Sequence, residues 1–107
     1  MTPEGRIKAA TVKRATEMGI KHIRMSFRRG VTAGWPDDLF LIPGGRPLFI
    51  EFKRPGKEPT PLQYHRLGEL RDLGYTAIWT DSADEACSAI ASAVESAAIH
   101  AQRCGAP

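Results

Sequence analysis

Two apolar segments separated by a short turn most constrain how this chain can fold. The segments read DDLFLI and PLFIEFK, and the PGGR between them is typical of a β-hairpin turn. Within the two segments, charged residues occur only at the open end of the hairpin: Asp37 and Asp38 begin the first strand, and Glu51 and Lys53 end the second. A buried charge is costly unless it is paired or binds a metal. We therefore expect these four residues to mark a functional site.

The turn should bring carboxylates of both strands together. If it is centred on the glycine pair 44–45, the residue facing Glu51 is Asp38 or its neighbour Asp37. Two carboxylates this close repel each other unless a cation lies between them. Hard oxygen ligands suit Mg²⁺ or Mn²⁺, so the hairpin predicts a site for one of these ions.

A lysine should lie at the same rim. Glu51 and Lys53 are two positions apart and point to one face of the sheet, whereas Ile50 and Phe52 point to the other. Such a lysine can orient or help deprotonate a water molecule and offset charge on phosphorus oxygens. The alternative is a simple salt bridge between Glu51 and Lys53.

Local signals predict the element order α-β-β-β-α-β-α, a mixed sheet flanked by helices. Helices are expected at residues 2–18, 60–73 and 82–102, each with a capping or first-turn signal at its start. Strands are expected at 20–27, 37–42, 47–53 and 75–80.

Composition indicates a single globular domain over residues 1–107. The chain is 42% hydrophobic and 25% charged, and no apolar run has the length of a membrane span or a signal segment. Its two cysteines and three histidines form no disulfide framework or zinc motif. We expect a cytoplasmic protein, in a bacterium or a phage-infected host, without an organic cofactor.

Positive charge is concentrated in the first third of the chain. Residues 1–36 hold eight lysines and arginines against two glutamates, and the segment KHIRMSFRRG has four cations and no acid. A phosphate-contacting surface beside the hairpin and a solvated basic face both fit this pattern.

The extended pattern GWPDDLFLIPGGRPLFIEFKRPGKEPTPLQYHRL…LGY resembles the virus-type replication-repair nuclease family, VRR-NUC, in the stand-alone form typical of phages. PD, thirteen residues and then EFK also match the PD-(D/E)xK nuclease core. The resemblance covers about residues 4–85 and implies a restriction-endonuclease-like α/β core. It also implies metal-dependent hydrolysis of DNA, with Asp37, Glu51 and the backbone carbonyl of Phe52 as metal ligands and Lys53 as a catalytic residue.

Three further residues are candidates for the site. Gln63 matches a glutamine that the family places near the metal, but Thr60 and Gln63 also form a capping box. Glu4 is either an additional metal ligand or a first-turn acid that favours the helix dipole, with Glu17 as a less favoured substitute. Asp38 is expected to be a supporting or solvated residue.

Other residues are expected to contact DNA or to form the hydrophobic core. Trp35 either contacts a base or covers the edge of the core. The candidate phosphate contacts are Arg24, Arg28, Arg29, Arg54, Lys57 and Arg66. The residues expected in the core are Leu39, Leu41, Ile50, Leu67, Leu70, Ile78 and Trp79.

The function expected from these features is a Mg²⁺- or Mn²⁺-dependent DNA endonuclease for branched DNA such as four-way (Holliday) junctions. The alternatives are a non-catalytic DNA-binding module and a nicking or restriction-like nuclease. Two cuts in a junction need two sites, which favours a homodimer. A stripe of small residues on the last helix can form the interface or pack on its own sheet; it comprises Ala86, Ile90, Ala93, Val94, Ala97 and Ala101.

Overall fold

The computed structural model describes residues 1–25 and 33–103, with side chains described as far as Ile99. The element order is the expected one, and the mixed α/β architecture is confirmed. The elements are α1 (Pro3–Glu17), β1 (Lys21–Arg24), β2 (Asp38–Ile42), β3 (Arg46–Phe52), α2 (Pro61–Asp72), β4 (Thr76–Thr80) and α3 (Ala83–Arg103). Residues 26 and 27 of the expected first strand lie outside the described part of the chain.

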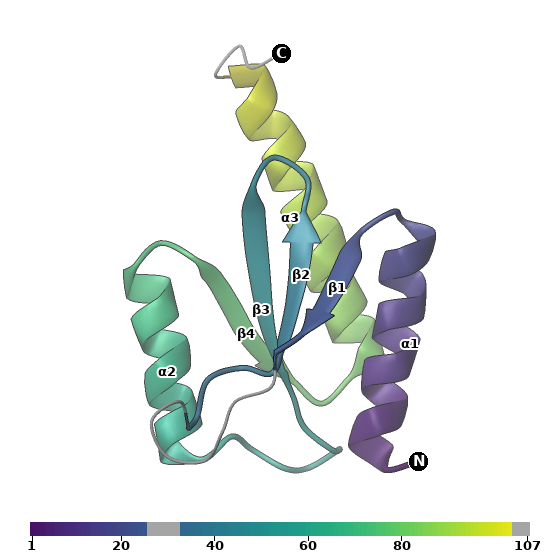
Figure 1. Ribbon diagram of the computed structural model, residues 1–107, viewed down its shortest axis with the longest axis vertical. Helices are drawn as coiled ribbons and strands as arrows, with labels where there is room; N and C mark the ends of the chain where they lie inside the picture. The colour runs from purple at the N-terminus through teal and green to yellow at the C-terminus, as the bar shows by residue number, and fades with distance from the viewer. Residues whose placement is uncertain (26–32, 104–107) are drawn as a thin grey trace.

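A four-stranded sheet with the order β1-β2-β3-β4 organises the molecule. The first two pairings are antiparallel, and β3 pairs with β4 in parallel because α2 carries the chain back between them. Figure 1 shows α2 beside β4 on one side of the sheet, and α1 and α3 on the other. No helix within residues 1–25 and 33–103 is long and apolar enough to cross a membrane.

Two hydrophobic clusters lie on the two faces of this sheet. The larger one combines Ala15 of α1 and three residues of α3 with Phe40, Ile42, Leu48, Ile50 and Phe52. The smaller one joins α2 to β4 through Leu67, Leu70 and Ala77. Because successive side chains alternate along a strand, Ile50 and Phe52 face α1 and α3, whereas Phe49 and Glu51 face the α2 side.

The core assignment was wrong for part of β2. Leu41 is 41% exposed and Leu39 only partly buried, whereas Phe40 is fully buried. Residues 39–42 are all apolar, so hydrophobic alternation does not indicate which face is buried. The packing of α1 and α3 decides it and selects Phe40 and Ile42.

The α3 stripe packs on the sheet of its own chain. Ala86, Ile90 and Ala97 are buried in the larger cluster, and Ala93 and Val94 pack against it. Most of the stripe is therefore used within one chain, which matches the packing alternative; Ala93 and Val94 stay partly exposed. The side chain of Ala101 lies outside the described residues.

The hairpin turn fixes the register of the two central strands. β2 ends at Ile42 and β3 begins at its partner Arg46, which leaves a three-residue loop. Gly44 and Gly45 have φ values of 92° and 74°, which side chains rarely adopt. The paired glycines therefore permit the turn that aligns the charged ends of the strands.

Candidate active site

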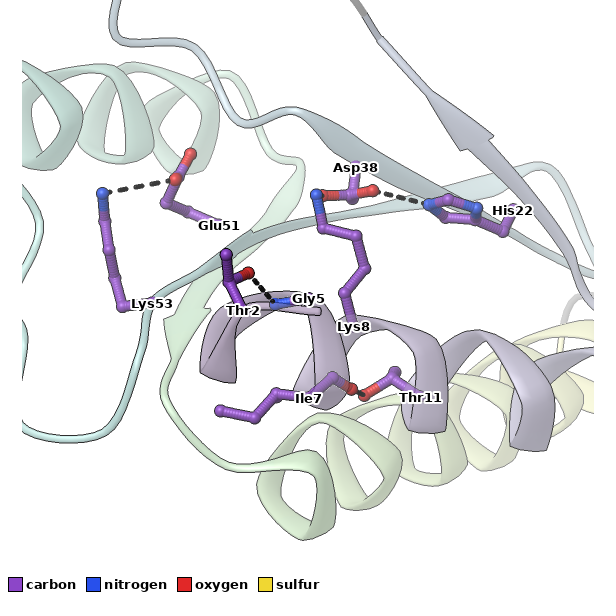
Figure 2. A network of polar contacts seen from close by, with 9 residues as sticks. All are labelled: Thr2, Gly5, Ile7, Lys8, Thr11, His22, Asp38, Glu51 and Lys53. Atoms are coloured by element: carbon purple, nitrogen blue, oxygen red, sulfur yellow. Dashed lines mark hydrogen bonds and ion pairs between the residues drawn. The ribbon is translucent and has the colours of Figure 1, made fainter.

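Glu51 and Lys53 form an ion pair at the end of β3. Lys53 Nζ lies 3.5 Å from Glu51 Oε2. Figure 2 marks this ion pair with a dashed line. Glu51 is only 5% exposed, so its carboxylate has lost most of its hydration. Burial raises the pKa of Glu51 to about 7; the Lys53 ammonium opposes this rise, and the charges of Asp37 and Glu4 add to it. Loss of hydration is thus the main cause of the raised pKa, and Lys53 offsets it only in part.

The strand register decides which aspartate faces Glu51. β2 pairs Asp38 with Ile50, so the preceding Asp37 lies opposite Glu51. The backbone carbonyl of Asp37 accepts a hydrogen bond of 2.6 Å from the amide of Met25, which ties this position to the end of β1. The side chain of Asp37 is exposed at the rim, whereas Glu51 is buried beneath it.

Glu4 reaches the same site from the first turn of α1. The helix begins after Thr2, whose hydroxyl accepts a hydrogen bond of 3.0 Å from the amide of Gly5. Glu4 and Lys53 both line a pocket of about 300 Å³. Glu17 ends the helix about 20 Å away along the axis, given a rise of 1.5 Å per residue. The structure thus brings Glu4 to the hairpin and leaves Glu17 remote.

Asp38 belongs to a separate, buried network, which matches the supporting role considered for it and not the solvated one. It is 1% exposed, and its two carboxylate oxygens lie 2.6 Å from His22 Nε2 and 3.0 Å from Lys8 Nζ. Its Oδ2 is unpaired by hydrogen-bond geometry, so the Lys8 contact is chiefly electrostatic. The network joins α1, β1 and β2, which fixes the helix that carries Glu4 against the strand that follows Asp37 (Figure 2).

Sequence reasoning missed Lys8 and His22. Lys8 follows Glu4 by one helical turn, which places the two residues on one face of α1. His22 is the cross-strand partner of Phe40, and only the β1–β2 register brings it near Asp38. The helical spacing was visible in the sequence, but the register was not.

Gln63 is engaged in the capping box at the start of α2. Its side-chain oxygen accepts a hydrogen bond of 2.9 Å from the amide of Thr60, and its own amide donates to Thr60 Oγ1 at 3.2 Å. This is the structural alternative that the sequence offered for Gln63. In this conformation its side-chain oxygen is directed at the backbone of its own helix.

The candidate phosphate contacts separate into three groups. Arg66 stacks 4.7 Å from the centre of the Trp35 ring and donates to Glu69 and to the carbonyl of Ala33, so it has a structural role. Arg24, Arg54 and Lys57 are exposed. Arg28 and Arg29 lie outside the described residues.

The segment before Asp37 packs against α2 through Trp35 and Gly34. Its ring packs against the cluster of Leu67 and Leu70, which matches the core-edge alternative considered for it. Beside it, Gly34 has a φ of 86°, and a Cβ atom at this position would lie 2.6 Å from Leu62 Cγ. The segment before Asp37 therefore approaches α2 too closely for any side chain at position 34.

The site has the donor chemistry of a hard-cation site. Among the described residues, no three histidine, cysteine or carboxylate side chains converge closely enough to hold a metal by themselves. The predicted set requires only Asp37, Glu51 and one backbone carbonyl, because Mg²⁺ retains several waters. Burial raises the pKa of Glu51 and the charges of Asp37 and Glu4 add to it, so an added positive charge here would stabilise the ionised carboxylate.

Comparisons with known proteins agree with this geometry. No family model matches the chain. "Putative nuclease p44" of Acyrthosiphon pisum secondary endosymbiont phage 1 is 44% identical over 57 residues, which is 53% of this chain and 57% of that protein. The chain thus matches little more than half the length of this curated relative.

Two solved structures share the fold. One, described as "VRR_NUC domain", has a TM-score of 0.73 and 25% identity, and the match covers 84% of this chain and 96% of the other. A second, "VRR_NUC domain protein", has a TM-score of 0.69 and 23% identity over 89% and 90% of the two chains, and at that identity it bears on the fold alone.

Proposed function

Because this chain carries a VRR-NUC domain, we propose that it is a Mg²⁺- or Mn²⁺-dependent endonuclease that hydrolyses phosphodiester bonds of DNA. One observation carries the proposal: a buried Glu51 lies beside Lys53 and opposite Asp37 on a nuclease fold. We propose that residues 1–107 act as one catalytic domain.

Each residue of the site has a proposed role. Asp37, Glu51 and the backbone carbonyl of Phe52 hold the cation, with Glu4 as a further ligand from α1. The cation supplies Lewis acidity and lowers the pKa of water. Lys53, held beside Glu51, positions the attacking water and stabilises charge that develops on the phosphate oxygens.

Gln63 has a conditional role. Its side chain contacts the attacked phosphate only after it leaves the amide of Thr60, so the cap and the catalytic contact belong to different states. The exposed cations Arg24, Arg54 and Lys57 contact backbone phosphates in both states.

The proposed substrate is branched DNA, with four-way junctions as the principal form. One such site breaks one bond, and a two-fold homodimer supplies two sites with the symmetry of a junction. Since the buried residues of the α3 stripe pack within their own chain, the proposed dimer uses another surface.

Cleavage of defined DNAs tests the proposal. Purified protein is incubated with end-labelled linear, flap, splayed and four-way DNAs in Mg²⁺, Mn²⁺ or EDTA. We expect metal-dependent cuts, with paired cuts in the four-way DNA, and a dimer by light scattering. Binding of every DNA without cleavage in either metal would favour the non-catalytic module. Single cuts by a monomer would leave a nickase.

A further inference from the structure

A second basic groove lies on the other side of the first turn of α1 from the Lys53 pocket. It has a volume of about 630 Å³ and runs between α1 and the end of β1, with Lys8, Lys13 and Arg24 among its lining residues. Thr2 and Glu4 line both the groove and the Lys53 pocket, so the two hollows adjoin at the proposed cleavage site. The first turn of α1 therefore forms a wall that the groove and the site share.

The cations of the groove differ in how far they are already neutralised. Lys8 lies 3.0 Å from Asp38 and is mostly buried, so its charge is committed to the protein interior. Lys13 and Arg24 are exposed, and neither has an ion-pair partner within the described part of the chain. Arg14, on another face of α1, instead pairs with Asp84 at 3.3 Å. Lys13 and Arg24 thus leave uncompensated positive charge along the groove.

The dimensions of the groove suit a nucleic-acid strand. From Glu4 to Lys13 the axis of α1 rises about 13 Å, which equals the rise of about four base pairs along the axis of B-form DNA. On the far side of Glu4, Arg54 and Lys57 line the Lys53 pocket. Exposed cations therefore flank the carboxylates on both sides.

We infer that the groove between α1 and β1 binds the sugar–phosphate backbone of DNA beside the cleavage site, with Lys13 and Arg24 as phosphate contacts. Lys13 is a binding residue that local sequence patterns did not single out. The inference rests on the proposed DNA-cleaving function. In this arrangement α1 places Glu4 at the cleavage site and also carries Lys13, which contacts the DNA backbone.

Binding to fluorescein-labelled four-way and duplex DNA, measured by anisotropy in EDTA over a range of salt concentrations, tests the groove without any cleavage. Lys13→Ala and Arg24→Ala should each weaken binding. Each should also lower the slope of log affinity against log salt by about 0.9, and the double variant by about 1.8. Arg46→Ala is the matched control, because Arg46 is an exposed cation at the opposite end of β3 from the site. Thermal unfolding checks that each variant is folded, with Lys13→Gln and Arg24→Gln as substitutes.

The results separate this inference from the proposed function. If the double variant kept the affinity and slope of the wild type, or if Arg46→Ala lost as much, the inferred DNA contacts of the groove would be wrong. Cleavage by the wild-type protein would be unaffected by that result. Conversely, if the groove variants lost DNA binding although the wild-type protein cut no DNA in Mg²⁺ or Mn²⁺, that result would support DNA binding by the groove and contradict the proposed nuclease activity.

Discussion

Asp37 and Asp38 are adjacent in sequence, yet they belong to different sites. The β2–β3 register sets Asp37 opposite Glu51 at the exposed rim, whereas Asp38 is buried between Lys8 and His22. One carboxylate is thus available to a ligand, and the other is used to hold α1 against the sheet.

This difference predicts opposite effects for two neighbouring substitutions. Asp38→Ala should lower the free energy of unfolding by on the order of 3 kcal/mol, because it leaves the mostly buried Lys8 without its partner. Asp37→Ala, at an exposed position, should change it by about 0.5 kcal/mol or less. Urea denaturation measures both.

Divalent-metal affinity should separate the same two variants. Titration calorimetry with Mn²⁺ should detect no binding to Asp37→Ala and near-normal binding to the folded fraction of Asp38→Ala. Equal metal affinity in Asp37→Ala and wild type would place the cation elsewhere.

The ionisation of Glu51 should make the metal-free protein less stable as the pH rises. Since the folded state raises this pKa to about 7, it holds the proton more tightly than the unfolded chain does. Stability in EDTA should fall from about pH 4.5 to 7 and then level off. Metal binding, which needs the carboxylate, should strengthen over the same interval.

Glu51→Gln should remove this penalty. At pH 8 in EDTA the variant should be more stable than wild type by about 2–3 kcal/mol, and near pH 4 the two should be equal. Added Mn²⁺ should stabilise only the wild type. A variant less stable than wild type at pH 8 would contradict the burial of a charged Glu51.

Lys53→Ala should separate binding from chemistry. Because Lys53 is proposed to act on the water and the phosphate oxygens, its loss should lower the cleavage rate by about 10²–10⁴-fold while DNA binding persists. Single-turnover cleavage and anisotropy measure the two effects. Lys21→Ala, an exposed lysine at the start of β1, is the control. Near-normal cleavage by Lys53→Ala would exclude its catalytic role.

Gln63→Ala should distinguish the cap from the chemistry. Loss of the capping box should cost about 0.5–2 kcal/mol of stability, and Thr60→Ala should cost a similar amount. A catalytic contribution requires that Gln63→Ala also lower the cleavage rate per folded molecule, whereas Thr60→Ala does not. Equal rates in the two variants would leave Gln63 as a capping residue only.

Gly34→Ala should disturb the packing of the segment before Asp37 against α2. The added methyl group would meet Leu62 Cγ at 2.6 Å, and the φ of 86° is unfavourable for alanine. Gly45→Ala has a similar φ of 74° but no atom within 4 Å, so it should cost only about 1–2 kcal/mol of backbone strain. We expect a larger loss of stability in Gly34→Ala, measured by thermal unfolding. An equal loss in both variants would show that the contact with Leu62 is relaxed at little cost.

The sequence by itself determined the elements and the side of the strand on which Glu51 and Lys53 meet. Caps, glycines and a period of two are local properties, so the helix starts, the hairpin and the common face of these two residues could be predicted. Hairpin geometry left the choice between Asp37 and Asp38 open, because one residue of register moves every side chain to the other face, and only the resemblance to the nuclease motif selected Asp37.

Tertiary structure alone decided the rest of the site. Residues 39–42 are uniformly apolar, so only the packing of α1 and α3 selected Phe40 over Leu41 as core. The same packing joined Lys8, His22 and Asp38, which lie far apart in the chain, and brought Glu4 to Glu51. Such contacts depend on how helices dock on a sheet, and no local pattern of residues encodes that geometry.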